Sequence, residues 1–180
     1  MPPTRAYRQH RPDDRDTPDM NTLYQEQQAL LGRQLAVLRR LRDGLRYSAG
    51  RLRWPITAAD LDDPEAAERL AALNDRFAKL QDQLAGAVRH AHSMLGERYR
   101  TYFDVITWMT HEGIITDPEV WLELRTLRNQ LTHDYDLEIQ TAAQYLNALH
   151  DNMDPLMAIV GRFADVCQKY RLLPALDGSE

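Results

Sequence analysis

An eight-residue segment in the second half of the chain holds residue types that can act on a phosphodiester. It contains Arg128, His133 and Tyr135, with Asn129 directly after the arginine. A guanidinium suits the binding of a phosphate, and an imidazole suits proton transfer near neutral pH. Together they predict metal-free cleavage, in which a ribose hydroxyl is deprotonated and the pentacovalent phosphorane is stabilised.

The spacing of Arg128 and His133 is weak evidence by itself, because Arg5 and His10 repeat it near the start of the chain. A capping histidine beside a surface arginine is the alternative interpretation. Residues five apart on a straight helix differ by about 140° around its axis. Arg128 and His133 can therefore converge only if the helix ends between them or if a second subunit completes the site.

A second candidate surface is rich in arginine. Arg39, Arg40, Arg42 and Arg46 lie close together, with Asp43 as the acid among them. Such a cluster predicts either contacts with RNA phosphates or simply a solvated helix face. The formal net charge of −5 argues against a protein that coats nucleic acid, although it allows a local basic patch.

Apolar residues at helical spacing predict an all-α chain, an antiparallel bundle of four or five helices. Asp63 before Pro64 and Asp117 before Pro118 mark two helix starts. The last helix keeps its apolar phase through Pro155, which predicts a kink there and not a new helix. The expected helices cover residues 21–49, 64–94, 99–112 and 118–131, and the last one runs from residues 136–138 to residue 170.

The composition predicts one domain in a reducing compartment. Residues 1–19 lack apolar periodicity and are expected to be disordered, residues 20–173 to form the bundle, and residues 174–180 to be a frayed tail. The single cysteine, Cys167, excludes an internal disulfide. Without an apolar run of membrane-spanning length or a secretory apolar region, the expected location is the cytoplasm.

The segments around the candidate site resemble one known family. The chain resembles the HepT-like branch of the HEPN family in residues 113–115 and 119–125, followed by Arg128, Asn129, His133, Asp134 and Tyr135. The signature of that branch is Arg, four residues, His, one residue and Tyr, commonly with Asn after the Arg. Residues 76–84 also resemble its long second helix, and the resemblance covers roughly residues 65–165.

The resemblance implies a HEPN-like bundle that forms a homodimer and acts as a ribonuclease toxin. Arg128 and His133 of both subunits would share one cleft as the catalytic pair, and Asn129 would support them. The implied partner is a minimal nucleotidyltransferase of the MntA type, which neutralises the toxin by adenylylating Tyr135. RNA is the implied substrate, and neither a metal nor a cofactor is expected.

Some relatives in this family are described as non-catalytic, substrate-binding subunits of minimal nucleotidyltransferases. They share every motif residue with the toxins, so the sequence allows a ribonuclease, a binding subunit or a plain helical scaffold. Gln81 and Asp82 are weaker candidates for the cleft, because the sequence does not say whether their helix faces it.

Overall fold

The chain folds into a bundle of helices in a computed structural model that describes residues 19–96, 101–133 and 139–175. The described residues contain no strand, so the all-α prediction is confirmed. Their seven helical segments outnumber the four or five expected. They are α1 (Met20–Ala49), α2 (Ala58–Asp62), α3 (Pro64–Met94), α4 (Tyr102–His111), α5 (Pro118–His133), α6 (Ile139–Asp151) and α7 (Met153–Lys169).

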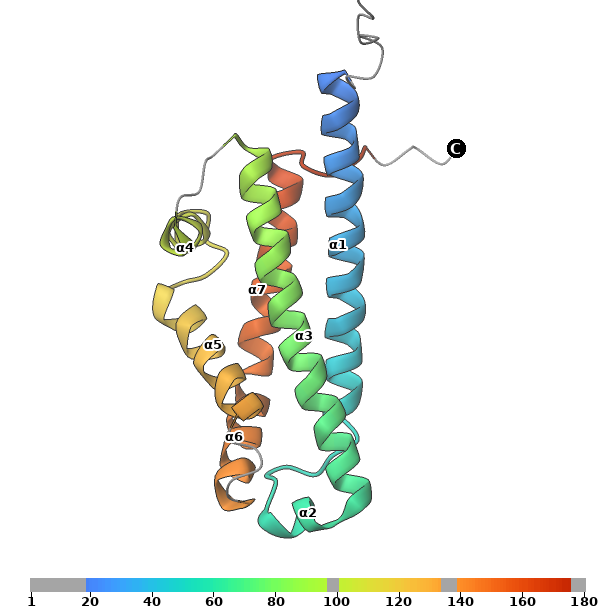
Figure 1. The fold of residues 1–180 in the computed structure, drawn as a ribbon, viewed down its shortest axis with the longest axis vertical. Coiled ribbons are helices and arrows are strands. Elements are labelled where there is room, and N and C mark those ends of the chain that lie inside the picture. Colours follow the sequence, from blue (N-terminus) through green and yellow to red (C-terminus); the bar gives the residue numbers. More distant parts are fainter. Residues whose placement is uncertain (1–18, 97–100, 134–138, 176–180) are drawn as a thin grey trace, which may run out of the picture.

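Two long helices form the spine of the bundle. α1 and α3 run antiparallel side by side, and α7 packs against both (Figure 1). Burying a leucine or phenylalanine side chain contributes about 1.5–3 kcal/mol, so the apolar residues at helical spacing stabilise this arrangement. The leucine and phenylalanine residues of these two helices that are at most 3% exposed are Leu31, Leu35, Leu38 and Leu45 of α1 and Leu70, Leu73, Phe77, Leu80 and Leu84 of α3.

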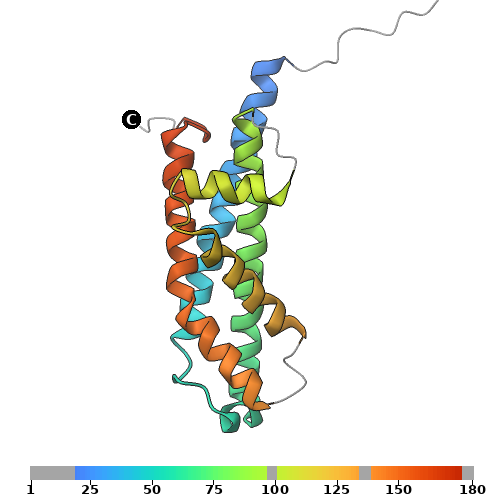
Figure 2. The same ribbon diagram turned by 90° about the vertical axis from the view of Figure 1, so that its left-hand side faces the viewer.

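α4 and α5 lie on a different flank of α3 from α1. Figure 2 shows α4 running across the bundle axis and α5 running obliquely along it. Trp121, Leu124 and Leu131 carry the apolar face of α5 into the core, each at most 1% exposed. The packing of α5 on this side of α3 therefore sets the position of Arg128 and of its described neighbours.

The predicted helix starts are confirmed. The Asp63 carboxylate accepts a hydrogen bond from the Ala66 N–H at 3.2 Å, and Pro64 is the first residue of α3. Asp117 accepts one from the Glu119 N–H at 2.8 Å where α5 begins. These acceptors satisfy N–H groups that the first turn leaves without a partner.

The prediction of one continuous last helix is wrong, because the chain breaks between α6 and α7 at Asn152. A proline has no N–H, and its ring clashes with the carbonyl four residues earlier, here that of Asp151. The helix therefore stops before Pro155, which occupies the first turn of α7. The Asn152 side-chain amide donates to the Ala148 carbonyl at 2.9 Å and secures the end of α6.

Four of the apolar residues expected in the core are exposed: Phe103 at 68%, Ile139 at 49%, Tyr170 at 37% and Tyr102 at 36%. Phe103 is about 160° around α4 from the buried Val105, so a ten-residue helix that packs on one side leaves it in solvent. Ile139 is the first residue of α6, and the first buried residue of that helix is Ala142, three positions later.

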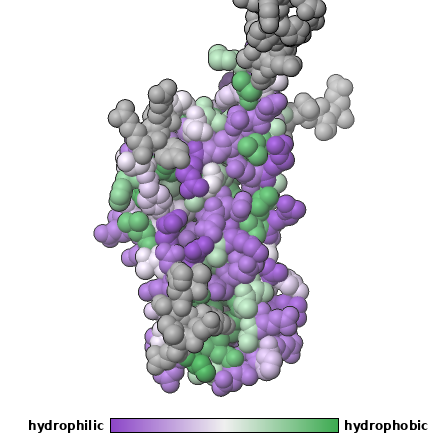
Figure 3. Space-filling model, in the orientation of Figure 1, coloured by the Kyte–Doolittle hydropathy of each residue, from purple (hydrophilic) through white to green (hydrophobic). Residues whose placement is uncertain are grey.

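The face of the molecule in Figure 3 is mostly hydrophilic, with separate hydrophobic patches. None of the helices in the described ranges combines the length and apolarity needed to cross a bilayer. The cytoplasmic location stays a prediction. So does disorder at the N-terminus, because residues 1–18 lie outside the described ranges.

Candidate functional site

Arg128 is held on the surface of α5 by an acid from another helix. Its Nη2 donates to the Asp82 Oδ2 of α3 at 2.9 Å, and its Nη1 donates to the Asn129 Oδ1 at 3.3 Å. The Arg128 side chain is 30% exposed and that of Asp82 is 48% exposed. An ion pair this open to water contributes about 0–1 kcal/mol to stability. Its main effect is therefore to fix where the guanidinium sits.

The last turns of α5 are fastened to α3 by a second polar contact. The Asn74 side-chain amide donates to the Leu131 carbonyl at 3.3 Å. Leu131 itself is buried at 1% exposure, so the backbone beyond Arg128 is anchored by both packing and hydrogen bonding. Arg128 therefore projects from a rigid element, which favours precise placement of a binding group.

The two weaker sequence candidates on α3 have different surroundings. Asp82 pairs with Arg128, so it belongs to the candidate site. Gln81 is 1% exposed, and its Nε2 has no hydrogen-bond partner among the described residues. The sequence offered one signal that separates them. Gln81 is about 60° from Leu84 around the helix, whereas Asp82 is about 160° from it.

α5 continues without interruption through His133, so the helix does not end between the two predicted catalytic residues. The side chain of His133 lies outside the described part of the chain. Its backbone position is about 140° from that of Arg128 and only about 20° from that of Thr126. Of the two routes to convergence expected from the sequence, a second subunit is the one compatible with this helix.

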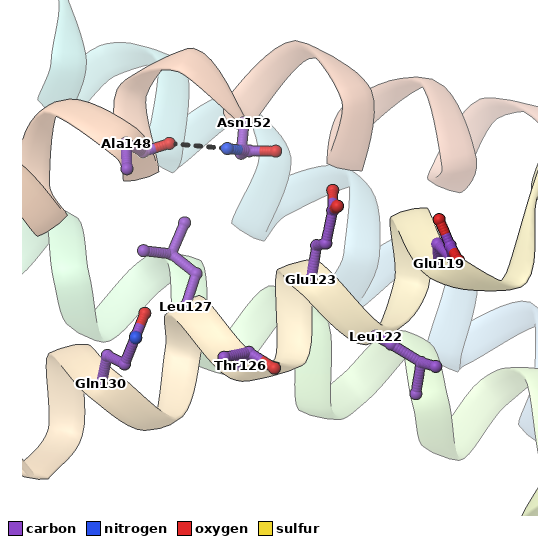
Figure 4. A pocket seen from close by; sticks show the side chains of 8 residues that line it. All are labelled: Glu119, Leu122, Glu123, Thr126, Leu127, Gln130, Ala148 and Asn152. Atoms are coloured by element: carbon purple, nitrogen blue, oxygen red, sulfur yellow. Dashed lines mark hydrogen bonds between the residues drawn. The ribbon is translucent and has the colours of Figure 1, made fainter.

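A shallow groove of about 490 Å³ follows the side of α5 on which position 133 lies. In Figure 4, Glu119 and Glu123 rise from α5 toward the junction of α6 and α7. Two carboxylates disfavour the approach of a phosphate, so this groove by itself does not suit an RNA backbone. Its lining residues are Glu119, Leu122, Glu123, Thr126, Leu127, Gln130, Ala148 and Asn152.

The remaining predicted residues do not join Arg128 in the described structure. Tyr135 lies outside the described residues. Arg39, Arg40 and Arg46 are exposed on α1, and Arg42 pairs with Asp43 at 3.1 Å. α1 contacts α3 and α7, and none of the described contacts joins these four arginines to α5. Their contact with RNA therefore stays a prediction, and the described contacts do not connect them with the Arg128 site.

The described residues contain no cluster of three or more His, Cys, Asp or Glu side chains that could hold a metal ion. The metal-free chemistry expected from the sequence stays a prediction.

We compared the chain with protein-family models, with curated proteins and with solved structures, and found no match in any of the three. The likeness to HepT-like HEPN proteins rests on sequence segments, residues 76–84, 113–115 and 119–125 and the motif from Arg128 to Tyr135. The helical bundle is established, and its HEPN-like character is a proposal.

Proposed function

We propose that this chain is the toxin subunit of a HepT/MntA-type pair, a metal-independent endoribonuclease with an Arg/His site. The observation that carries the proposal is Arg128, a surface guanidinium fixed by Asp82 and Asn129 one and a half turns before His133. A guanidinium held in place before the substrate arrives loses little freedom on binding a phosphate. The motif residues thus combine a positioned cation with a titratable base.

The proposed reaction is an internal transfer within RNA. His133 removes the proton from a ribose 2′-hydroxyl, whose oxygen attacks the adjacent phosphorus. The bond to the 5′-oxygen of the next nucleotide breaks, and that oxygen takes up a proton from water. Arg128 stabilises the additional negative charge on the phosphorane oxygens. The products are a 2′,3′-cyclic phosphate and a 5′-hydroxyl.

Cleavage of total RNA by the purified chain in the presence of EDTA tests the proposal. Replacing Arg128 or His133 with Ala should abolish cleavage and growth arrest, while Arg33→Ala, an exposed change on α1, should leave both intact. A magnesium requirement, or full activity in His133→Ala, is incompatible with the proposed mechanism.

The proposed site is shared between two chains. Because positions 128 and 133 diverge around α5, we infer that Arg128 of one subunit acts with His133 of the other in a symmetric homodimer. Sedimentation at micromolar concentration should give a dimer. Co-expressed Arg128→Ala and His133→Ala chains should regain up to roughly a quarter of the native activity, since mixed dimers keep one intact pair. A monomer, or no recovery in the mixture, argues against the shared site.

Tyr135 is the proposed regulatory residue. An adenylate on its phenol would bring a bulky anion next to the catalytic guanidinium and would compete with the RNA phosphate. After co-expression with a nucleotidyltransferase encoded beside this chain, mass spectrometry should find adenylate on the Tyr135 peptide. Tyr135→Phe should prevent this addition. Adenylate on Tyr145, with Tyr135 unmodified, contradicts the assignment.

The second candidate function is a non-catalytic binding subunit of such a nucleotidyltransferase. One observation favours it: the charge of Arg128 is already balanced by Asp82 within the chain. This function predicts association with the nucleotidyltransferase, no RNA cleavage and no growth arrest when the chain is expressed alone.

A further inference from the structure

A cavity of about 960 Å³ lies between α1 and the segment that follows α7. In Figure 1 this segment leaves the end of α7 and crosses toward α1. Apolar lining residues include Leu35, Leu173 and Pro174, and the charged ones are Arg39 and Arg171. A volume of this size falls within the range of small-molecule sites in proteins.

The crossing segment is held in place by hydrogen bonds from one side chain of α1. Gln28 Nε2 donates to the Arg171 carbonyl at 3.0 Å and to the Leu173 carbonyl at 3.2 Å. Leu172, between these two residues, is buried at 1% exposure. The wall of the cavity is therefore fastened by both backbone contacts and a buried anchor.

Gly32 keeps part of this space open. A Cβ built on it would lie 3.6 Å from the Pro174 Cδ, an ordinary van der Waals contact. A methyl group would therefore fit, whereas a longer side chain from this position would extend into the cavity that Gly32 lines. Glycine lowers helix stability in the interior of α1. A destabilising residue at the place where the cavity needs room suggests that the cavity has a use.

The charged residues that line the cavity are all positive. No Asp or Glu is among its described lining residues, and within the described ranges neither Arg39 nor Arg171 forms an ion pair. Arg171 also has a φ of 53°, in the left-handed region that favours glycine. An arginine at a position where glycine is more stable points to a use for its side chain.

We propose that this cavity binds an organic anion with an apolar body. A carboxylate or phosphate pairs with Arg39 and Arg171, because a guanidinium offers two parallel N–H donors to either group. The apolar body covers Leu35, Leu173 and Pro174. The site is separate from Arg128, whose partner Asp82 lies on α3, so it holds whether or not the chain cleaves RNA.

Fluorescence titration with 1-anilinonaphthalene-8-sulfonate, an anion with an aromatic body, tests the site on the full chain. We expect saturable binding of one probe per chain. Arg39→Gln and Arg171→Gln should each raise the Kd about tenfold, the equivalent of one charge-assisted hydrogen bond. Arg40→Gln removes a neighbouring exposed charge outside the cavity and should leave the Kd unchanged.

Shape is tested separately from charge. Gly32→Leu should abolish binding while raising the melting temperature, because Leu favours the helix more than Gly does. The uncharged probe N-phenyl-1-naphthylamine should bind less tightly, with no response to the two Arg→Gln changes. Equal Kd values for the native chain and both arginine variants overturn the proposal, even if Gly32→Leu fails to fold.

Competition identifies the acid group. Displacement of the probe by palmitate and not by AMP assigns a carboxylate on an aliphatic body. Displacement by AMP and not by palmitate assigns a phosphate on an aromatic body. If neither competes at millimolar concentration, the assignment to an organic anion with an apolar body is wrong.

Discussion

Arginine occurs in two contrasting settings in this bundle. On α5, Arg128 lies against the Asp82 carboxylate, so its charge is balanced within the chain while its position is fixed. Along the middle of α1, Arg39 and Arg171 line a cavity that has no acid among its described lining residues. The first setting favours placement of a group for chemistry, and the second favours attraction of an anion. Residue type alone does not distinguish them.

The largest expected effect separates the two settings by activity. Arg128→Ala and His133→Ala should each lower the rate of RNA cleavage by ~10²–10⁴. Neither change should alter the Kd for the anionic probe in the cavity, and circular dichroism should show unchanged helicity. A loss of probe binding in Arg128→Ala would show that the two regions are not independent sites.

Another acid, Glu112, has several charge-assisted partners. Its side chain is 4% exposed and accepts from Lys169 Nζ at 2.9 Å and from the Tyr170 hydroxyl at 2.8 Å. Burial would raise the pKa of Glu112, but the hydrogen bonds from Lys169, Tyr170 and His111 outweigh it, so the pKa lies below its ordinary value of 4.5. The carboxylate therefore stabilises the fold through its charged form.

Glu112→Gln should lower the free energy of unfolding at neutral pH by about 1 kcal/mol, because charge-assisted hydrogen bonds are lost while water screens the exposed Lys169 partner. The native contribution is complete above the unfolded pKa and is lost as the pH falls through the lower folded pKa. Urea unfolding at several pH values should therefore show the difference between the two chains shrinking in acid. Glu65→Gln, at an exposed pair with Arg69, should change stability by no more than about 0.5 kcal/mol.

Asp82 is expected to act as a positioning residue, with a smaller effect than Arg128. Asp82→Asn should lower kcat for RNA cleavage about tenfold with little change in KM, since the guanidinium stays but loses its fixed orientation. Asp82→Glu should restore part of the activity. The matched control is Asp75→Asn, which removes the exposed Asp75–Lys79 pair of the same helix and should leave kcat unchanged. Equal effects of Asp82→Asn and Asp75→Asn on kcat would contradict the assignment of Asp82 as a positioning residue.

The smallest expected effect has opposite signs for stability and binding. Arg171→Gly relieves the left-handed backbone at φ 53° and should raise the free energy of unfolding by ~0.5–1 kcal/mol. The same change should weaken binding of the anionic probe. Thermal denaturation and the probe titration measure the two quantities on one preparation. A destabilised Arg171→Gly would show that the side chain supports the fold, which contradicts its assignment to a ligand.

Much of the fold follows from local patterns. Apolar spacing identifies the buried faces of α1 and α3, and Asp63–Pro64 marks the start of α3, because capping depends on neighbouring residues. The short α2 was not anticipated, although Thr57 and Asp60 form a capping box there. Periodicity needs several turns to be visible, so a helix of five residues leaves almost no signal.

The candidate site could be predicted only in part. The segment from Arg128 to Tyr135 is visible in the sequence because its residue types and spacing are local. Its partner Asp82 is 46 residues away, and only the packing of α5 on α3 brings the two together. The cavity between α1 and the crossing segment likewise joins Gln28 to carbonyls 143 and 145 residues away.

The sequence by itself determined the long helices α1 and α3, their buried faces and the motif from Arg128 to Tyr135, because each depends on residues within a few turns. Tertiary structure alone decided that α5 continues through His133, that Asp82 and not Gln81 meets Arg128, and that Arg39 and Arg171 share one cavity. The physical reason is that helix propensity and capping act over a few residues. Contacts between helices depend instead on how the whole set of apolar faces packs, which no single segment specifies.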